Sequence, residues 1–248
     1  MIEFVQSDSE IIYGSPVERR RFFDIAASHS SSSYYNSLRK FLRSLKQRNL
    51  QIKKDISCNK NERHLWDQIL AQNAAVLIKH RKKLAEDLSF RCNKKLESFT
   101  NESSRLTIEY CPSFDIDWNN VEKSFLETLQ KSYKVENIYK STVRGPHRDN
   151  FIFYKNGKDM RKYASQGEVR LAVLSLKLAL VEHLSEIYNM HPILIFDDIL
   201  LELDDVNAQR LLSSLDSSNQ VFFTSTRVPD LDFFKGMDKN FFFNIGKY

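Results

Sequence analysis

The chain has 248 residues, of which 42% are hydrophobic and 28% are charged, proportions typical of a globular protein. This length allows one large domain or two smaller ones around a sizeable core. No apolar run is long enough to span a membrane, and MIEFVQSDSE lacks the pattern of a signal peptide, so we expect a cytoplasmic protein without membrane contact. The cysteines, Cys58, Cys92 and Cys111, are far apart without a CxxC motif, which argues against a disulfide framework and a zinc site.

The formal net charge of +5 is unevenly distributed along the chain. The segment 39–95 contains sixteen Lys or Arg and five Asp or Glu, a net charge of +11, so the remaining residues carry −6. Positive charge concentrated in one segment is expected of a surface that binds the phosphate backbone of a nucleic acid. The alternative is that these cations are only the solvated faces of helices.

The same basic segment predicts a pair of helices. Apolar residues recur every seven positions over 38–52 and again over 70–88. The polar stretch DISCNKNER separates the two patterns, so we expect an antiparallel helical hairpin whose apolar stripes pack together. Neither pattern continues beyond about three heptads. We therefore expect a short arm over residues 34–100.

Strands become more frequent after the arm. SRLTIEY alternates between apolar and polar residues as a strand does, and DIDWNNVEKSFLETLQKSY predicts a helix capped by Asp117. The next segment, NFIFYKNGKDMRKYA, predicts two extended pieces that turn at Asn156 and Gly157.

The last third predicts alternating helices and strands. We expect a buried helix over 167–189, a strand in PILIFDD, a helix over 204–216, a strand in QVFFTST and a hairpin in NFFFNIGKY. The predicted fold is an α/β half-domain over residues 101–248, with a head segment over 1–33 that precedes the arm.

Two adjacent acids end the most apolar predicted strand. In HPILIFDDILLELDD, Asp197 and Asp198 follow ILIF at the carboxyl end, where open parallel sheets bind ligands. One carboxylate there can hold Mg²⁺ beside nucleotide phosphates, and a second can orient or deprotonate an attacking water. The alternative is an Asp that ends a strand as a turn former.

A second candidate site begins the long buried helix. In YASQGEVRL, Ser165 and Gly167 lie where free backbone N–H groups and the helix dipole favour an anion. Glycine also lets the backbone approach a phosphate closely. The spacing of Ser165 and Glu168 predicts an ordinary capping box as well, and both interpretations can hold together.

The order of these motifs resembles an ABC-type ATPase head, with SQGE as the signature motif, ILIFDD as the Walker B strand and ELDD as the D-loop. Together with GSPVERRRFFD, LKQRN, GPHRD and NGKDMRKYASQGEVR, they are similar to the RecF family of DNA repair proteins, within the SMC and ABC ATPase superfamily. The resemblance implies an α/β fold. It consists of a partial ABC-ATPase head, with a mixed or parallel sheet flanked by helices, plus a short antiparallel helical-hairpin arm.

The resemblance also implies roles for the candidate residues. Asp197 would help to hold Mg²⁺, and Asp198 occupies the position of the catalytic carboxylate. The signature would act in trans on ATP bound by the partner subunit of an ATP-dependent homodimer. The remaining nucleotide-site residues are Ser165, Gln166, Gly167 and Glu168 in the signature, Leu203 and Asp204 in the D-loop, and Thr224 and Ser225 at the switch position.

The function implied is DNA metabolism. Members of the family bind DNA at single-strand/double-strand junctions and act with RecO and RecR to load RecA, in replication, repair, recombination and the SOS response. For Arg19 to Arg21, a structural brace between arm and head is the alternative to DNA contact. The predicted DNA-contacting residues, whose cations reach phosphate oxygens, are Arg19, Arg20, Arg21, Lys46, Arg48, Lys53, Lys54 and Arg148.

The sequence departs from the family in two respects. These residues contain no G-x-x-x-x-G-K-[ST], the loop that holds the β- and γ-phosphates, and Glu168 stands where Gln is common in the signature. We therefore expect no ATPase activity from these residues alone. Three expectations remain open: an ATPase in a longer form, a non-catalytic module that binds DNA and partners, and a poorly folded remnant with an exposed sheet edge.

Overall fold

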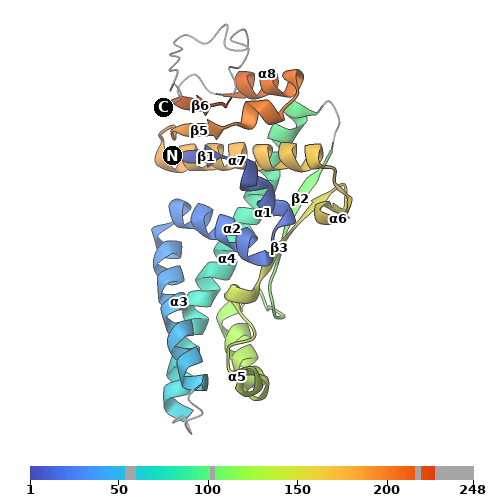
Figure 1. The fold of residues 1–248 in the computed structure, drawn as a ribbon. Coiled ribbons are helices and arrows are strands. Elements are labelled where there is room, and N and C mark those ends of the chain that lie inside the picture. The colour runs from blue at the N-terminus through green and yellow to red at the C-terminus, as the bar shows by residue number, and fades with distance from the viewer. Residues whose placement is uncertain (54–59, 101–103, 216–218, 227–248) are drawn as a thin grey trace.

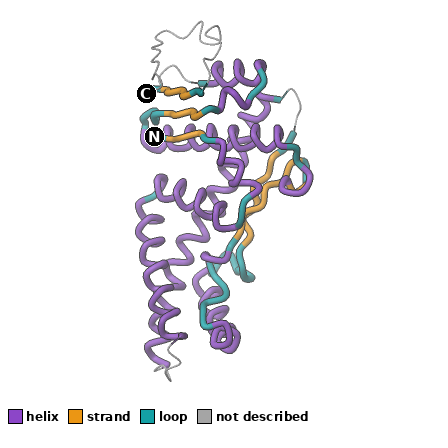
Figure 2. The backbone as a smooth tube through the Cα atoms, viewed as in Figure 1, coloured by secondary structure: helices purple, strands orange, loops and turns teal. Residues whose placement is uncertain are grey.

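The computed structural model describes residues 1–53, 60–100, 104–215 and 219–226. These residues form a head that contains a parallel sheet and an elongated helical arm that extends away from it (Figure 1). Helices predominate, and the strands gather in two separate sheets (Figure 2). No described helix is both long and apolar enough to cross a membrane. The predicted hairpin in NFFFNIGKY lies outside the described residues.

The parallel sheet has the strand order β1-β5-β6. Strands β5 (Leu194–Asp197) and β6 (Val221–Thr224) confirm the two predicted strands. Strand β1 (Ile2–Phe4) was not predicted, because three residues give no readable alternation. It pairs in parallel with β5, and its partner residues are far away in the chain, since Ile2 lies beside Leu194.

Stacked phenylalanines hold this sheet together. The ring of Phe196 lies 4.2 Å from that of Phe4 and 5.0 Å from that of Phe223, centroid to centroid. All three are on the face that the sheet turns towards the core. The stack fixes the strand that carries Asp197.

The predicted helices around the sheet are confirmed. Helix α7 (Gln166–Tyr188) contacts β1 and runs alongside the sheet, and α8 (Asp205–Ser214) lies beyond β6 (Figure 1). Helix α7 is buried on most of its circumference, as its apolar residues predict. Its buried apolar residues are Val169, Ala172, Val173, Leu174, Leu176, Leu178, Ala179, Leu180, Val181 and Leu184.

The second sheet is antiparallel, with β2 (Leu106–Cys111), β3 (Asn150–Lys155) and β4 (Lys158–Asp159) in that order. The predicted turn is confirmed, since Asn156 and Gly157 have φ angles of 50° and 77°, as a type I′ turn requires. Strand β4 has only two residues because helix α6 (Met160–Tyr163) begins at once, with Asp159 as its side-chain cap.

The arm consists of α3 (Ser32–Lys53) and α4 (Lys60–Phe99), which pack against each other and confirm the helical hairpin. Helix α4 is longer than the heptad pattern predicts. Its last turns bury Cys92, Leu96 and Phe99 against the head, where α4 contacts α7 and β2. The helix therefore runs continuously from the arm into the head (Figure 1).

Helix α5 (Val121–Tyr139) packs beside α4, and its predicted cap is wrong. The helix begins at Val121 after Asn120, not after Asp117. Asp117 Oδ1 instead accepts a hydrogen bond from the N–H of Asn119, at 3.0 Å. This local turn ends before the helix starts, so the carboxylate stabilises the loop and not the helix.

Short helices complete the described fold. Helix α2 (Pro16–Ser30) begins with Ser15 as a side-chain cap and a proline in the first turn. The remaining elements are η1 (Gln6–Ser9), α1 (Glu10–Tyr13), η2 (Pro146–Arg148) and η3 (Ile199–Glu202).

A buried arginine joins the arm to the head. Arg81 of α4 donates to Asp24 Oδ1 of α2 at 2.8 Å and to the carbonyl of Pro146 at 2.7 Å. Its guanidinium also lies 3.7 Å from Asp149 Oδ2. These contacts give GPHRD a structural role, because they fix the loop that carries it against α4.

Candidate functional site

The three parallel strands end at one edge of the sheet. Phe4 is beside Phe196, and Asp197 is beside Thr224. The residues that follow β1, β5 and β6 therefore lie together at the carboxyl edge, where open parallel sheets bind ligands. The structure thus brings together the predicted residues Asp197, Asp198 and Thr224.

Hydrogen bonds link the two acids to β6. Asp197 is exposed, and its Oδ1 accepts a hydrogen bond from the Thr224 hydroxyl. Asp198 has a φ angle of 55°, in the left-handed region, and its Oδ1 accepts from the N–H of Thr226 at 2.8 Å. Strained backbone of this kind is common at functional sites. The edge is therefore ordered, with the Asp197 carboxylate accessible.

The donor set at this edge suits a magnesium ion that also binds phosphate. No group of three His, Cys, Asp or Glu side chains within the described ranges could hold a metal by itself. Magnesium commonly takes only one or two carboxylates and fills its other positions with water and phosphate oxygens. An exposed Asp197 beside a hydroxyl fits that pattern.

Gln6 is a candidate that the sequence did not single out. It follows β1 at the same edge and lines a cavity of about 40 Å³ next to η3. The cavity wall is braced by an ion pair between Lys177 and Asp8 and another between Arg170 and Glu202. The local sequence around Gln6 gives no sign of a functional role. Its place at the carboxyl edge becomes visible only through the pairing of β1 with β5.

The D-loop residues have clear structural contacts. Leu203 is partly buried against the core. Asp204 caps α8, since its Oδ1 accepts from the N–H of Asn207 at 2.9 Å, and this bond lowers the pKa of Asp204. The position of Asp204 is therefore fixed by the helix that follows it.

The signature residues form the predicted capping box. The N–H of Glu168 donates to Ser165 Oγ at 3.3 Å, and the N–H of Ser165 donates to Glu168 Oε2 at 2.8 Å. Ser165, Gln166 and Gly167 are exposed, and a methyl group on Gly167 would meet no atom within 4 Å. The amino end of α7 is thus open to an approaching ligand or subunit.

Glu168 is held by a further partner. Lys155 Nζ lies 2.7 Å from Glu168 Oε1. This contact is the largest cause, and the hydrogen bond from the Ser165 backbone the second largest, of a fall in the pKa of Glu168 from 4.5 to about 2. The carboxylate is therefore used within the chain, in the capping box and in an ion pair.

We expect the free energy of unfolding to depend on Glu168 only above about pH 2. A lowered folded-state pKa adds stability that is complete above the unfolded pKa of 4.5 and is lost as the pH falls towards 2. Glu168→Gln keeps the capping geometry but loses the partly exposed ion pair, so at pH 7 it should cost about 0.5 kcal/mol. Urea unfolding from pH 7 to pH 2 should show this cost shrinking. Glu97→Gln, at an exposed residue, is the control. If the stability cost of Glu168→Gln relative to this control stays constant from pH 7 to pH 2, the assignment is contradicted.

The structure separates the predicted DNA contacts into two groups. Arg21, Lys46, Lys53 and Arg148 are exposed. Arg20 is partly exposed and donates to the carbonyl of Asp149 at 2.7 Å. Lys54 lies outside the described residues. The other two candidates, Arg19 and Arg48, are fully buried.

Arg19 is a brace, and its prediction as a surface DNA contact is wrong. Its Nε donates to Asn150 Oδ1 at 2.9 Å, and its Nη1 donates to the carbonyls of Gly14 at 2.6 Å and Ile12 at 3.2 Å. These bonds join α2 to α1 and β3. Arg19 is therefore a brace within the head, and not the brace between arm and head that was the alternative to DNA contact.

Arg48 is also wrong as a surface contact. Its Nε lies 2.7 Å from Asp67 Oδ1, and its Nη2 lies 2.7 Å from Glu136 Oε2, with both carboxylates fully buried. Its Nη1 donates to the Thr142 hydroxyl at 2.7 Å. Arg48 thus joins the two arm helices, α3 and α4, to α5 beside them.

The outer surface of α3 remains strongly basic. We name this set of exposed cations the α3 basic face. None of its members forms an ion pair with a carboxylate in the described part of the chain, so their charge is available to a phosphate. The members are Arg39, Lys40, Arg43, Lys46 and Lys53.

The chain is similar to curated proteins over its full length, although no protein-family model matches it. It is 35% identical over 249 residues to the DNA replication and repair protein RecF of Streptococcus suis strain 05ZYH33, covering 100% of this chain and 68% of that protein. It is also 35% identical over 250 residues to the protein of the same name from Ruminiclostridium cellulolyticum, covering 98% and 67%. The chain spans about two thirds of the length of these relatives.

Solved structures show the same fold. A structure of the recombination mediator protein RecF-ATPrS in the RecFOR pathway matches with a TM-score of 0.83 at 31% identity, covering 91% of this chain and 62% of that one. The corresponding RecF-ATP structure matches with a TM-score of 0.82 at 30% identity, with the same coverage. The predicted α/β fold class, a partial head with a helical-hairpin arm, is confirmed.

Proposed function

The chain belongs to the RecF family of DNA replication and repair proteins, and on that premise we propose that it is a DNA-binding recombination mediator. In this proposal the arm binds the DNA backbone, and the head supplies part of a nucleotide site. The arm corresponds to residues 34–100, and the head to residues 1–33 and 101–248. The family match and the two candidate surfaces described above support this assignment.

The α3 basic face is the observation that carries DNA binding. Its five exposed cations lie on one helix that projects from the head, and no described carboxylate neutralises them. Lysine and arginine contacts with phosphate oxygens give affinity without sequence preference. Arg21 and Arg148 are further exposed candidates outside this helix. We propose single-strand/double-strand junctions as the substrate, since a gap in DNA presents both forms.

We expect the double variant Lys46→Glu, Lys53→Glu to bind duplex DNA at least roughly tenfold more weakly than the unaltered chain at about 0.1 M salt. Two phosphate contacts are lost, so the slope of log affinity against log salt should also become shallower by about two units. Fluorescence anisotropy of a labelled duplex measures both quantities.

A matched control tests whether the loss of DNA affinity depends on where the charges are reversed, and not only on the change in net charge. Lys158→Glu, Lys162→Glu makes the same charge change at exposed residues of the head, near the β3–β4 turn. We expect it to leave both affinity and slope nearly unchanged. Equal losses in the two double variants would reject the α3 basic face as the DNA site.

The head proposal concerns ATP and Mg²⁺. We propose that Asp197 helps to hold Mg²⁺, that Asp198 acts on the attacking water, and that Thr224 and Ser225 border the phosphates. The convergence of three strand ends supports this arrangement, as do relatives whose structures contain ATP or ATPrS. Magnesium would neutralise developing charge on the phosphates. The 248 residues contain no phosphate-binding loop, so a nucleotide also needs contacts that they do not supply.

The signature and D-loop are proposed to act between subunits. Exposed Ser165, Gln166 and Gly167 would face nucleotide bound by the partner subunit of an ATP-dependent homodimer, with Leu203 and Asp204 at the same interface. Glu168 would position the helix end through its capping box. In the RecFOR pathway named for the similar structure, RecO and RecR are the proposed partners, and loading of RecA is the proposed outcome.

A further inference from the structure

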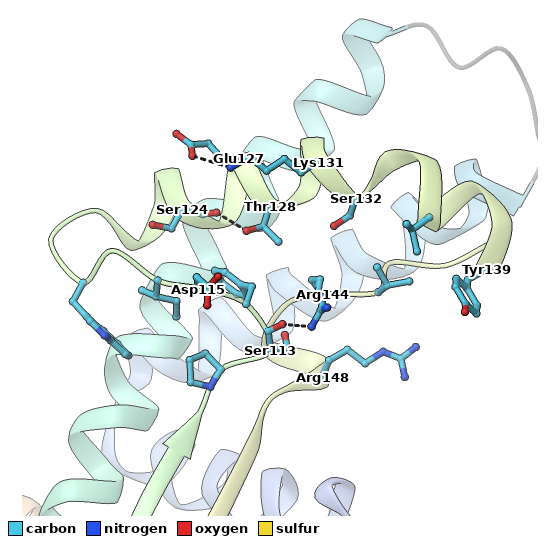
Figure 3. Close-up of a pocket in the computed structure, with 16 residues that line it drawn as sticks. Ser113, Asp115, Ser124, Glu127, Thr128, Lys131, Ser132, Tyr139, Arg144 and Arg148 are labelled. Atoms are coloured by element: carbon cyan, nitrogen blue, oxygen red, sulfur yellow. Dashed lines mark hydrogen bonds and ion pairs between the residues drawn. The ribbon is translucent and has the colours of Figure 1, made fainter.

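A large open cleft lies beside the arm, where α5 packs on α4, far from the strand-end site. It has a volume of about 1350 Å³ and opens between α5, residues 112–118 and residues 143–148 (Figure 3). In Figure 1 these segments lie at the opposite end of the molecule from the parallel sheet. None of the roles proposed above uses this cleft, apart from Arg148 at its rim.

Helix α5 presents one continuous face to the cleft. Its opposite face is buried against the arm, through Val121, Phe125 and Leu129 among others. The cleft-facing residues recur at helical spacing, with small hydroxyl side chains in the middle and larger groups towards the carboxyl end. They are Ser124, Glu127, Thr128, Lys131, Ser132, Val135 and Tyr139.

Exposed aromatic rings stand at two ends of the lining. Tyr139 is 69% exposed, and Trp118 is 40% exposed with the Lys82 ammonium 3.9 Å from its ring centroid, which leaves its other face for stacking. Trp118 belongs to the 112–118 segment, which Phe114 anchors by stacking on Phe125 at 5.0 Å. A ring that is held in place while its surface is accessible can stack with an unpaired base, whatever the base identity.

Cations border the same cleft. Arg144 Nη1 donates to the carbonyl of Ser113 at 2.6 Å, and the rest of its side chain is exposed. Arg148 is exposed and forms no ion pair within the described ranges. Lys131 is 80% exposed and lies 3.8 Å from Glu127. Figure 3 shows Arg144 and Arg148 on the loop below α5.

The loop that carries both arginines is fixed from behind. Gly145 has a φ angle of 126°, and a side chain there would collide with the ring of Phe125. Arg81 holds the Pro146 carbonyl, and the Ser113 hydroxyl bonds to the backbone of Gly145. The cations are thus presented by an ordered loop, which reduces the conformational entropy lost on binding.

We propose that this cleft binds single-stranded DNA. Unpaired bases would stack on Trp118 and Tyr139, while phosphates reach Arg144, Arg148 and Lys131. A duplex would leave the rings unused, because its base faces are already stacked on one another. A strand of about four nucleotides matches the smallest sites of this kind. This inference rests on the proposed DNA-binding function and adds a second site, for the unpaired strand beside a duplex held on the α3 basic face.

The test uses a thymidine oligonucleotide of about ten residues and the fluorescence of Trp118. Trp66 is first replaced by phenylalanine, so that Trp118 is the only tryptophan in the full chain. We expect the oligonucleotide to quench Trp118 fluorescence saturably, and added salt to weaken the binding. Quenching by an acidic, aromatic-containing peptide without quenching by the oligonucleotide would overturn the proposal in favour of a protein partner.

Two exposed positions localise the binding. We expect Tyr139→Ala to weaken oligonucleotide binding roughly tenfold, through loss of one stacking partner. Lys131→Glu should make the salt slope shallower by about 0.7, the contribution of one single-strand phosphate. Lys158→Glu is the matched charge control. Thermal unfolding of each variant checks that its fold is retained, as expected for side chains this exposed.

The outcomes distinguish this proposal from the proposed function. Single-stranded binding that Tyr139→Ala and Lys131→Glu leave unchanged would overturn the cleft, while DNA binding by the chain would stand. Failure to bind either duplex or single-stranded DNA would overturn both. Weaker single-stranded binding in these two variants, with duplex binding unchanged, would establish the cleft as a separate site.

Discussion

Replacing Arg48 by methionine is expected to lower the free energy of unfolding by about 3–5 kcal/mol. The guanidinium is 1% exposed and pairs with the buried carboxylates of Asp67 and Glu136. Methionine fills part of the volume but supplies no donor, so two carboxylates remain buried without their main partner. A buried charge left without its partner is far more costly than a lost surface contact.

Urea unfolding of the variant and of Lys46→Met measures this difference. Lys46 is two residues away on the same helix and exposed, so its substitution should change stability by about 0.5 kcal/mol or less. At low urea, where both variants are folded, only Lys46→Met should weaken duplex binding. A stable Arg48→Met variant that binds DNA poorly would restore Arg48 as a DNA contact and refute its structural role.

Asp198→Asn is expected to reduce ATP hydrolysis by at least about 100-fold in the native protein, isolated as its own cells make it. Asparagine cannot accept the proton of an attacking water, whereas the carboxylate can. The fold at this position should survive, because asparagine tolerates a φ angle of 55° and its oxygen can still accept from Thr226. The change therefore removes one chemical capacity with little change in shape.

Steady-state phosphate release with Mg²⁺ and DNA measures this effect. Asp205→Asn, in the exposed first turn of α8, is the control and should keep the wild-type rate. Hydrolysis by Asp198→Asn at the wild-type rate would contradict the proposed role. If the native protein hydrolyses no ATP under these conditions, that result would also contradict the role of Asp198. It would favour a non-catalytic module that binds DNA and partners.

Features set by neighbouring residues could be predicted from the sequence. The Asn156-Gly157 turn depends on the φ preferences of two adjacent residues, and the Ser165–Glu168 capping box depends on a spacing of three. Both are present as predicted. Strand β1 could not be predicted, because its stability comes from pairing with β5, far away in the chain.

The burial of Arg48 was predictable in principle. On α3, Leu45, Arg48 and Ile52 are three and four residues apart, which places them on one helical face. Lys46 lies on another face, so two neighbouring cations have opposite environments. A count of positive charge over residues 39–95 does not register this difference. Arg19 gives the same signal, since buried Phe23 and Ala26 are four and seven residues further along α2. Its hydrogen-bond partners Gly14 and Asn150 could not be predicted, because they lie outside that helix.

The affinity of the unaltered chain for a duplex with a single-stranded extension, measured against salt concentration, tests the central claim most directly. If the α3 basic face holds the DNA backbone, log affinity should fall with log salt at a slope of about −4.5, since five cations each contribute about −0.9. Affinity that does not change with salt, or no binding at about 50 mM salt, would contradict DNA binding by this arm.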